Sequence, residues 1–241
     1  MSELGRYLTK NEKKYRELRK KTLSKINAQT IADNPFLFAN RTTVTETIAR
    51  YEIFKKIINI SGAIIECGVH NGNNLLLFSH LSSILEPYAI NRKIIGFDTF
   101  EGFRSIEKED PEDITENNFD NVNLEALKDA INLYDMNRAV GHMKRVEIIK
   151  GDAVKTIGDY VKNNPALTVA LLYLDFDIYK PTKIALEKLF PLVCKGGVIA
   201  FDEFNYDKFP GETEAVKEFF KVNDMKFERF YFDPFIAYTI I

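Results

Sequence analysis

Acidic side chains recur where short apolar segments of the chain come to an end. Five such segments finish on or just before carboxylates, at Glu66, Asp98, Asp152, Asp175 with Asp177, and Asp202 with Glu203. A single acid at the end of a strand is often only the cap of the next helix, but five in succession are not well explained in that way. If the segments are parallel strands, their carboxyl ends share the edge of the sheet at which ligands bind. The acids therefore predict a ligand site at that edge.

The turn after the first acid is typical of a cofactor site. Gly68 and Gly72 let the backbone turn sharply and approach a ligand closely. The helix expected to begin near Asn73 offers free amide groups to an anion, best a carboxylate. Asp98, at the end of the second segment, can accept hydrogen bonds from both hydroxyls of a ribose. The glycine pair alone is also compatible with an ordinary strand-to-helix turn, but together with Asp98 and Asp152 it favours a nucleoside-containing cofactor.

Asp175, Asp202 and Glu203 form a second group, at the ends of the fourth and fifth segments. Three carboxylates that converge repel one another unless they bind a cation. Oxygen-only ligands suit Mg²⁺, Ca²⁺ or Mn²⁺. The alternative is that one or two of these acids cap helices or pair with lysines such as Lys180 or Lys208.

The elements that must hold these side chains alternate between strands and helices. Strands are expected at residues 63–67, 93–98, 145–151, 167–175 and 197–201. A helix is expected after each strand, at residues 73–85, 123–137, 181–190 and 211–222, and, after the third strand, ending at about residue 163. Two further segments, 226–232 and 235–241, predict a closing antiparallel hairpin. Strands that alternate with helices indicate βαβ units. The sequence therefore predicts an α/β fold with a doubly wound, mostly parallel, seven-stranded sheet, a C-terminal antiparallel hairpin and a helical N-terminal extension.

The start of the chain is expected to be a helical arm. Residues 3–27 have a sparse apolar stripe that predicts a basic helix, and residues 28–41 read as a loop around Asn34-Pro35. Thr43 and Glu46 then make a capping-box pattern at the start of the next helix. We therefore expect a basic helical arm at residues 1–41 and one α/β domain at 42–241, with a lid insertion at 103–137.

Charge is distributed unevenly along the chain. The formal net charge is −2, from 33 Lys and Arg against 35 Asp and Glu. Residues 1–25 carry +6 (nine basic, three acidic), whereas residues 101–135 carry −8 (three basic, eleven acidic). A basic excess is usual for proteins whose main task is to bind nucleic acid, so the balance predicts no such partner. The acidic residues 103–122 are interpreted as a mobile lid over an acceptor pocket, or as a plain solvated loop.

The overall composition is that of a globular protein, with 45% hydrophobic and 28% charged residues. The two cysteines, Cys67 and Cys194, cannot make a disulfide framework and are expected to be reduced, buried thiols. No His/Cys spacing suits a zinc site. The N-terminus lacks the apolar segment of a secretory signal, and the longest hydrophobic run, residues 169–174, is far shorter than the ~20 residues that span a bilayer. These features predict a soluble, cytoplasmic protein.

Five sequence strings together resemble one enzyme family: IIECGVHNGNN, IGFDTFEGF, LLYLDFDIYKPT, GGVIAFDEF and FPGETEAVKEFF. They are similar to the macrocin/mycinamicin O-methyltransferases, a branch of the class I S-adenosylmethionine-dependent methyltransferases. The resemblance covers roughly residues 41–222. It implies the Rossmann-like class I methyltransferase fold, S-adenosylmethionine and Mg²⁺ as cofactors, a sugar hydroxyl of a macrolide as the acceptor, and assembly into dimers or higher oligomers.

The resemblance also implies roles for individual residues. The methionine part of the cofactor would lie in the loop of Glu66, Gly68, Gly72 and Asn73, the ribose on Asp98 beside Thr99 and Phe100, the adenine against Asp152 and Ala153, and Mg²⁺ on Asp175, Asp202 and Glu203. Two positions depart from the family pattern: Asn73 replaces a second glycine, and Glu203 replaces a second aspartate. Both replacements keep the backbone amides and the carboxylate chemistry that the roles need.

A sugar hydroxyl is a poor nucleophile at neutral pH, so methyl transfer to it needs a group that withdraws the proton. A divalent ion bound to the hydroxyl lowers its pKa, and Asp175 or Asp177 can then accept the proton, with nothing in the sequence to choose between them. His142 is a weaker candidate, because a lone histidine before a strand is more often a surface residue. The aromatic residues of the turn 204–211 are candidates for a wall of the acceptor pocket, or for ordinary packing.

We therefore expect a Mg²⁺-dependent O-methyltransferase that acts on a hydroxyl of a sugar or of a glycosylated small molecule. One alternative is a metal-independent methyltransferase acting on nitrogen or on protein. Another is a non-catalytic, nucleotide-binding α/β module. A nicotinamide dehydrogenase is less compatible, because the glycine loop lacks the three-glycine spacing that lets a backbone approach a pyrophosphate.

Overall fold

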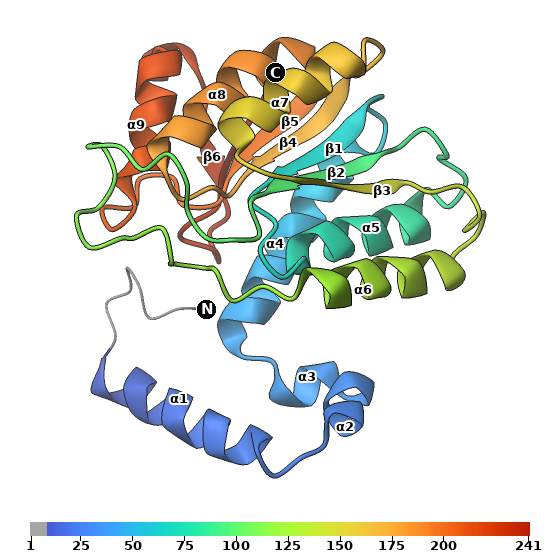
Figure 1. The fold of residues 1–241 in the computed structure, drawn as a ribbon, viewed down its shortest axis with the longest axis vertical. Coiled ribbons are helices and arrows are strands. Elements are labelled where there is room, and N and C mark those ends of the chain that lie inside the picture. The colour runs from blue at the N-terminus through green and yellow to red at the C-terminus, as the bar shows by residue number, and fades with distance from the viewer. Residues whose placement is uncertain (1–8) are drawn as a thin grey trace. The chain divides into compact units, whose positions relative to one another are not determined.

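The computed structural model describes residues 9–241 and has at its centre a seven-stranded sheet (Figure 1). The strand order is β3-β2-β1-β4-β5-β7-β6, and the first five strands are parallel. Those five are β1 (Ala63–Cys67), β2 (Ile94–Asp98), β3 (Val146–Lys150), β4 (Val169–Leu174) and β5 (Val193–Phe201). The order reverses between β1 and β4. The predicted doubly wound sheet is confirmed, and the reversal creates the crevice in which such sheets bind ligands.

The register brings the carboxyl ends of the strands level with one another. Cys67 of β1 pairs with both Phe97 of β2 and Leu174 of β4, and Leu174 pairs in turn with Phe201 of β5. The residues that follow these four positions, Gly68, Asp98, Asp175 and Asp202, therefore lie side by side at this edge of the sheet. This register is what gathers acids from distant parts of the sequence at one edge.

Helices cover both faces of the sheet (Figure 1). One face packs against α4 (Arg41–Ile57), α5 (Asn73–Leu85) and α6 (Leu124–Met136). The other packs against α7 (Ala153–Asn163), α8 (Tyr179–Leu189) and α9 (Pro210–Phe219). Successive residues of a strand point to opposite faces, so Ile64 lies in the first core and Ile65 in the second. Burial on both faces explains why the central strands read as continuous apolar runs.

The C-terminal strands close the sheet in antiparallel fashion. β7 (Ala237–Ile240) pairs with β5 on one side and with the short β6 (Glu228–Arg229) on the other. The Asp233 carboxylate turns the chain between them by accepting hydrogen bonds from the amides of Phe235 and Ile236, at 3.0 and 3.1 Å. The predicted hairpin is confirmed, with strands shorter than the sequence suggested.

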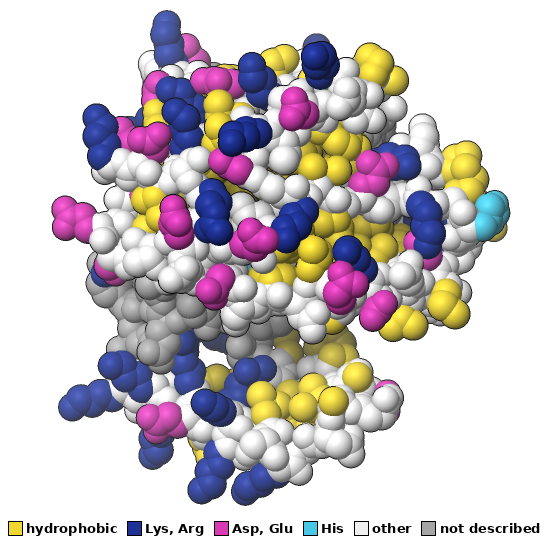
Figure 2. All heavy atoms as spheres, viewed as in Figure 1, with side chains coloured by type: hydrophobic (Ala, Val, Ile, Leu, Met, Phe, Trp, Pro, Cys, Tyr) yellow, Lys and Arg dark blue, Asp and Glu magenta, His cyan; other side chains and the backbone are white. Residues whose placement is uncertain are grey.

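The chain divides into two compact units, Met1–Ile48 and Ala49–Ile241. In the first unit, α1 (Lys10–Leu23) begins at a capping box formed by Thr9 and Glu12, and all of its residues are at least partly exposed. Lys and Arg side chains predominate on it (Figure 2). The first eight positions of the expected arm lie outside the described residues. Within residues 9–241, none of the helices combines the length and the apolar character needed to cross a bilayer.

Two short helices stand where residues 28–41 were expected to form a loop, and this expectation was wrong. They are α2 (Ala28–Asp33), capped by Asn27, and α3 (Pro35–Phe38), which starts with a proline in its first turn. The Arg19 guanidinium donates two hydrogen bonds to the carbonyl of Phe38, at 3.0 and 3.2 Å, and so ties α3 to α1. Helices of six and four residues are too short to show an apolar period in the sequence.

Two helix starts also differ from the expected ones. Asn40, rather than Thr43, caps α4: its side chain accepts a hydrogen bond from the Thr43 amide at 2.8 Å. α8 begins at Tyr179, ahead of the proline at 181, because the Tyr179 amide finds an acceptor in the distant Asp110 carboxylate at 2.7 Å. Both cysteines are free thiols, Cys67 buried and Cys194 only half-buried.

Candidate active site

The turn between β1 and α5 is built on two glycines with left-handed backbone. Gly68 has a φ of +100°, and a Cβ there would lie 1.9 Å from the carbonyl oxygen of Asp175. Gly72 has a φ of +82° and is the N-cap of α5, where no side chain caps the helix. The first amides of a helix have no partner within the helix, so the start of α5 can receive an anionic group. The segment expected to bind the cofactor is a tight, glycine-dependent turn, and its role in binding stays a prediction.

Asp98 binds the backbone of this turn. Its Oδ2 accepts hydrogen bonds from the amides of Val69 and His70, at 2.7 and 2.8 Å, and its Oδ1 accepts one from Phe100 at 2.6 Å. A carboxylate has about four acceptor positions, so capacity remains on Oδ1 for a ligand hydroxyl. Sequence reasoning assigned Asp98 to a ligand only and missed that the same side chain joins the end of β2 to the turn after β1.

Replacing Asp98 by alanine is expected to weaken binding of S-adenosylhomocysteine about 10- to 100-fold, because charge-assisted hydrogen bonds to three amides are lost. Isothermal titration calorimetry measures the change. The control is Asp113→Ala, which removes an exposed carboxylate and should leave the affinity unchanged. Equal affinity of the Asp98 variant and the wild type would contradict the assignment.

Asp152 caps a helix. It is the N-cap of α7, and its Oδ1 accepts a hydrogen bond from the Val154 amide at 3.0 Å. Its Oδ2 accepts a second one from the Ser105 hydroxyl at 3.1 Å. The capping explanation that a single strand-end acid allows therefore applies here, next to the buried Ala153.

Six carboxyl groups influence one another near the ends of β1, β2, β4 and β5. Burial, and then the nearby Asp202 and Asp177 carboxylates, raise the pKa of Asp175 well above its ordinary value. Burial, with the carboxylates of Asp202 and Asp98, raises the pKa of Asp177 to about 8. Burial likewise raises the pKa of Glu66 and of Glu212 well above the ordinary value. Mutual repulsion among carboxylates at this edge is the property expected from acids at the ends of neighbouring strands.

Two further residues of the site were missed in the sequence. Arg50 of α4 is buried, and its Nη2 lies 2.9 Å from Oδ1 of Asp202. Glu212 in the first turn of α9 is fully buried, and its Oε1 accepts a hydrogen bond from the Glu203 amide at 3.2 Å. A signal for both existed. Arg50 lies at helical spacing from Ile53, Phe54 and Ile57, and Glu212 from Ala215 and Val216, so each charge stands on an apolar stripe.

The donor set is chemically suited to a hard divalent cation, since it consists of carboxylate oxygens only. A cation would also relieve the repulsion that raises the pKa of Asp175. No group of three or more His, Cys, Asp or Glu side chains within residues 9–241 is already arranged to hold an ion. Lys180, an expected alternative partner, lies instead 3.8 Å from Glu107. The side chains thus fit the ion by chemistry, and they must reorient to enclose it.

The acidic residues 103–122 are attached to the domain at several points. Asp110 is buried and accepts hydrogen bonds from the amides of Glu107 and Tyr179. Phe103 and Ile114 are buried as well. The ring of Phe119 packs edge-on against His70, with 5.6 Å between the ring centroids. The segment therefore adjoins the glycine turn and the start of α8, which are the sides of the candidate site.

The other residues expected near the acceptor, the aromatic residues of the turn 204–211 and His142, lie in different environments. Phe204 stacks on Phe227, with centroids 4.8 Å apart, which is the ordinary packing foreseen as an alternative. Tyr206 contacts the ring of Phe235 at 5.1 Å and remains half-buried. His142 is exposed in the loop before β3, at the amino ends of the strands. It is therefore not brought to the edge where the acids meet.

Comparison with known proteins gives the family. The sequence matches the family described as Macrocin-O-methyltransferase (TylF) over residues 6–238. A crystal structure of CalS11, a calicheamicin methyltransferase, is similar at a TM-score of 0.89 and 27% identity, covering 98% of this chain and 94% of that one. The apo structure of CalS11, described as a TDP-rhamnose 3'-O-methyltransferase of calicheamicin biosynthesis, is similar at a TM-score of 0.83 and 27% identity. This match covers 98% of this chain and 96% of that one.

The O-methyltransferase NovP shares the fold, at a TM-score of 0.63 and 21% identity over 82% of this chain and 79% of that one. No curated protein sequence matches the chain. The family match extends over nearly the whole sequence, and the glycine turn, the acid at the end of β2 and the class I sheet agree with it. The protein therefore belongs to the macrocin-O-methyltransferase (TylF) family and is an S-adenosylmethionine-dependent O-methyltransferase.

Proposed function

We propose that the protein methylates a hydroxyl group of a sugar and that the reaction depends on Mg²⁺. The observation that carries the proposal is the meeting of the Asp175, Asp177 and Asp202 carboxylates beside the glycine turn, where the Asp202 carboxylate raises the pKa of both Asp175 and Asp177. A neutral acceptor hydroxyl needs both a base and a means to stabilise the developing oxyanion. Clustered acids that bind a cation would supply these two requirements.

The methyl donor would bind along the carboxyl ends of β1, β2 and β3. The turn after β1 and the start of α5 would receive the methionine carboxylate and amine, Asp98 the ribose, and the start of α7 the adenine. The residues assigned to the donor are Glu66, Gly68, Gly72, Asn73, Asp98, Thr99, Phe100, Asp152 and Ala153. The supporting contacts are those of Asp98 with the turn and of Asp152 with α7.

Asp177 is the preferred general base. It lies in the turn after β4 with a left-handed φ of +63°, and its carboxylate interacts with those of Asp98 and Asp202. It therefore interacts with one acid on the proposed donor side and with one acid of the proposed cation site. Asp175 is less suited, because it accepts a hydrogen bond from the Asn74 side chain at 3.1 Å and adjoins the glycine turn. As the C–O bond forms and the S–C bond of the donor breaks, Asp177 would accept the hydroxyl proton.

Asp175, Asp202 and Glu203 would hold the cation. When bound, a divalent ion would lower the pKa of the acceptor hydroxyl and orient it. Glu212 would support this side of the site, since its carboxyl group holds the Glu203 amide at the start of the turn that carries both ligands.

The acceptor we propose to test first is a sugar linked to a nucleoside diphosphate. The support is the description of the similar CalS11 as a TDP-rhamnose methyltransferase, at 27% identity over nearly the full length of both chains. A sugar on a finished small molecule is the second candidate. Residues 103–122 and the half-buried Tyr206 would border the acceptor in either case.

The test is methyl transfer from labelled S-adenosylmethionine to TDP-rhamnose by the purified full chain, followed by liquid chromatography and mass spectrometry. We expect a product heavier by one methyl group, loss of turnover in excess EDTA, and recovery when Mg²⁺ is restored. Full turnover in EDTA would contradict the cation. Methylation of proteins or amines in preference to any sugar would contradict the acceptor class.

A further inference from the structure

A buried arginine and a buried tyrosine hold one oxygen of Asp202. Nη2 of Arg50 lies 2.9 Å from Oδ1 of Asp202, and Nε of the same guanidinium donates to the Tyr173 hydroxyl at 3.1 Å. The Tyr173 hydroxyl in turn donates to the same Oδ1. Arg50 is 4% exposed and Tyr173 is fully buried. The three side chains therefore form a closed triangle of contacts in the interior of the domain.

The elements of the fold fix this triangle. Arg50 comes from α4, Tyr173 from β4 and Asp202 from the residue after β5. Tyr173 pairs in register with Ala200, and both lie in the core that packs against α4. Because side chains alternate along a strand, position 202 points to the same face as position 200. Two buried residues, Arg50 and Tyr173, thus hold the Asp202 carboxylate from the core side of the sheet.

We infer that Arg50 and Tyr173 are positioning residues that set the cation affinity of the active site by holding Oδ1 of Asp202 and turning Oδ2 toward the ion. The inference rests on the proposed function, since it concerns the cation site proposed there. Groups that orient a ligating carboxylate commonly change metal affinity 10- to 100-fold when they are removed. An arginine is suited to the task because its planar fork bonds to two partners at once, which a lysine cannot reproduce.

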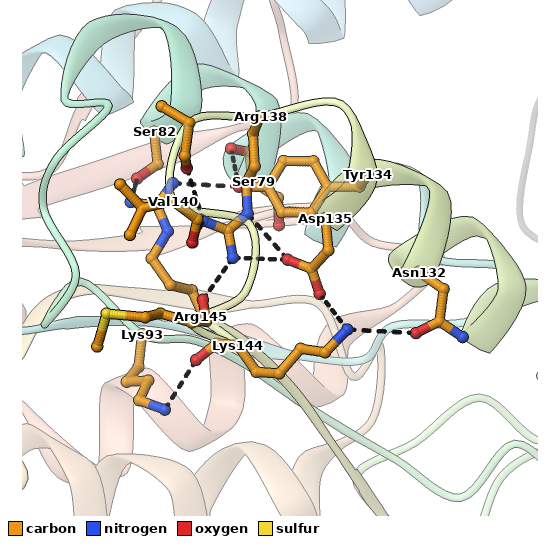
Figure 3. A network of polar contacts seen from close by, with 12 residues as sticks. Ser79, Ser82, Lys93, Asn132, Tyr134, Asp135, Arg138, Val140, Lys144 and Arg145 are labelled. Carbon is orange, nitrogen blue, oxygen red and sulfur yellow. Dashed lines mark hydrogen bonds and ion pairs between the residues drawn. The ribbon is translucent and has the colours of Figure 1, made fainter.

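The chain offers a matched control at the opposite edge of the sheet. Arg145, just before β3, is buried, and its Nη2 donates to the Tyr134 hydroxyl at 3.3 Å (Figure 3). Tyr134 donates in turn to the carbonyl of Ser79 at 2.8 Å, so the same pair of residue types is joined in the same way. No acid of the candidate site takes part in this network. Substitutions in it report what the loss of a buried Arg–Tyr contact does to the fold alone.

The experiment measures Mn²⁺ binding by the full chain saturated with S-adenosylhomocysteine, with free Mn²⁺ followed by electron paramagnetic resonance. Tyr173→Phe and Arg50→Lys are expected to raise the Kd for Mn²⁺ about 10-fold. Tyr134→Phe and Arg145→Lys are expected to leave it within about twofold of the wild type, even if they lower the melting temperature as much. In the turnover assay, the two site variants should lose kcat while KM for S-adenosylmethionine is unchanged.

The possible outcomes separate the two proposals. A normal Kd for Mn²⁺ in Tyr173→Phe overturns the inference and leaves the cation site standing. Equal weakening in the control pair also overturns it, since the effect would then come from general loss of stability. Absence of Mn²⁺ binding to the wild type overturns both the cation site and the inference. If Arg50→Lys fails to fold, Tyr173→Phe decides the question, with S-adenosylhomocysteine binding as the evidence that it is folded.

Discussion

Replacing Asp177 by asparagine is expected to lower kcat about 10²- to 10⁴-fold, the range typical of a lost general base. Asparagine keeps the size of the side chain but cannot accept the hydroxyl proton. Burial and the neighbouring carboxylates raise the pKa of Asp177 to about 8 in the ion-free protein. The fraction of Asp177 that is deprotonated, and so able to accept a proton, therefore increases as pH rises. Wild-type turnover should therefore fall as pH drops, and the asparagine variant should lack this dependence.

The measurement is initial rate against pH with a sugar acceptor, together with calorimetry of S-adenosylhomocysteine binding. Binding should be retained, since Asp177 is not among the residues assigned to the donor. Asp159→Asn, on the exposed side of α7, serves as the control and should keep full activity. An Asp177→Asn enzyme with normal kcat would show that another group removes the proton.

Replacing Gly68 by alanine is expected to abolish donor binding and to lower the free energy of unfolding by about 3 kcal/mol or more. The φ of +100° is unfavourable for alanine, and the new Cβ would lie 1.9 Å from the carbonyl oxygen of Asp175. That carbonyl is backbone at the end of β4, so the turn rather than a side chain must move. The displaced turn carries the amides that bond to Asp98.

The matched control for this change is Gly158→Ala, in the middle of α7, where a Cβ meets no atom within 4 Å. Alanine there should raise the free energy of unfolding by about 0.5–1 kcal/mol. Urea denaturation of both variants, with calorimetry of S-adenosylhomocysteine binding, measures the two effects. A Gly68→Ala protein with wild-type stability and affinity would show that the turn tolerates a side chain and is not closely packed against β4.

Much of the fold could be predicted from the sequence, because strands buried on both faces and helices that alternate with them leave strong local patterns. The segment at 63–67 and the helix at 73–85 have the bounds expected. The expected secondary structure was wrong where the hydrophobic pattern is weak or where a residue distant in the sequence sets the start of a helix. The helices α2 and α3 are too short for a period to show, and α8 starts early because Asp110, 69 residues away in the sequence, caps it.

The sequence by itself determined which acids follow the strands, because each lies next to an apolar run whose buried, parallel character can be read locally. It also identified the glycines of the turn after β1 and the family. Only the tertiary structure decided how those acids are held. Arg50, Tyr173 and Glu212 come from an interior helix face, a strand interior and a helix start, and only strand register and helix packing bring them to Asp202 and Glu203. A charge on an apolar stripe can mark Arg50 or Glu212 as unusual, but it does not say which acid each contacts, because that depends on strand register and helix packing.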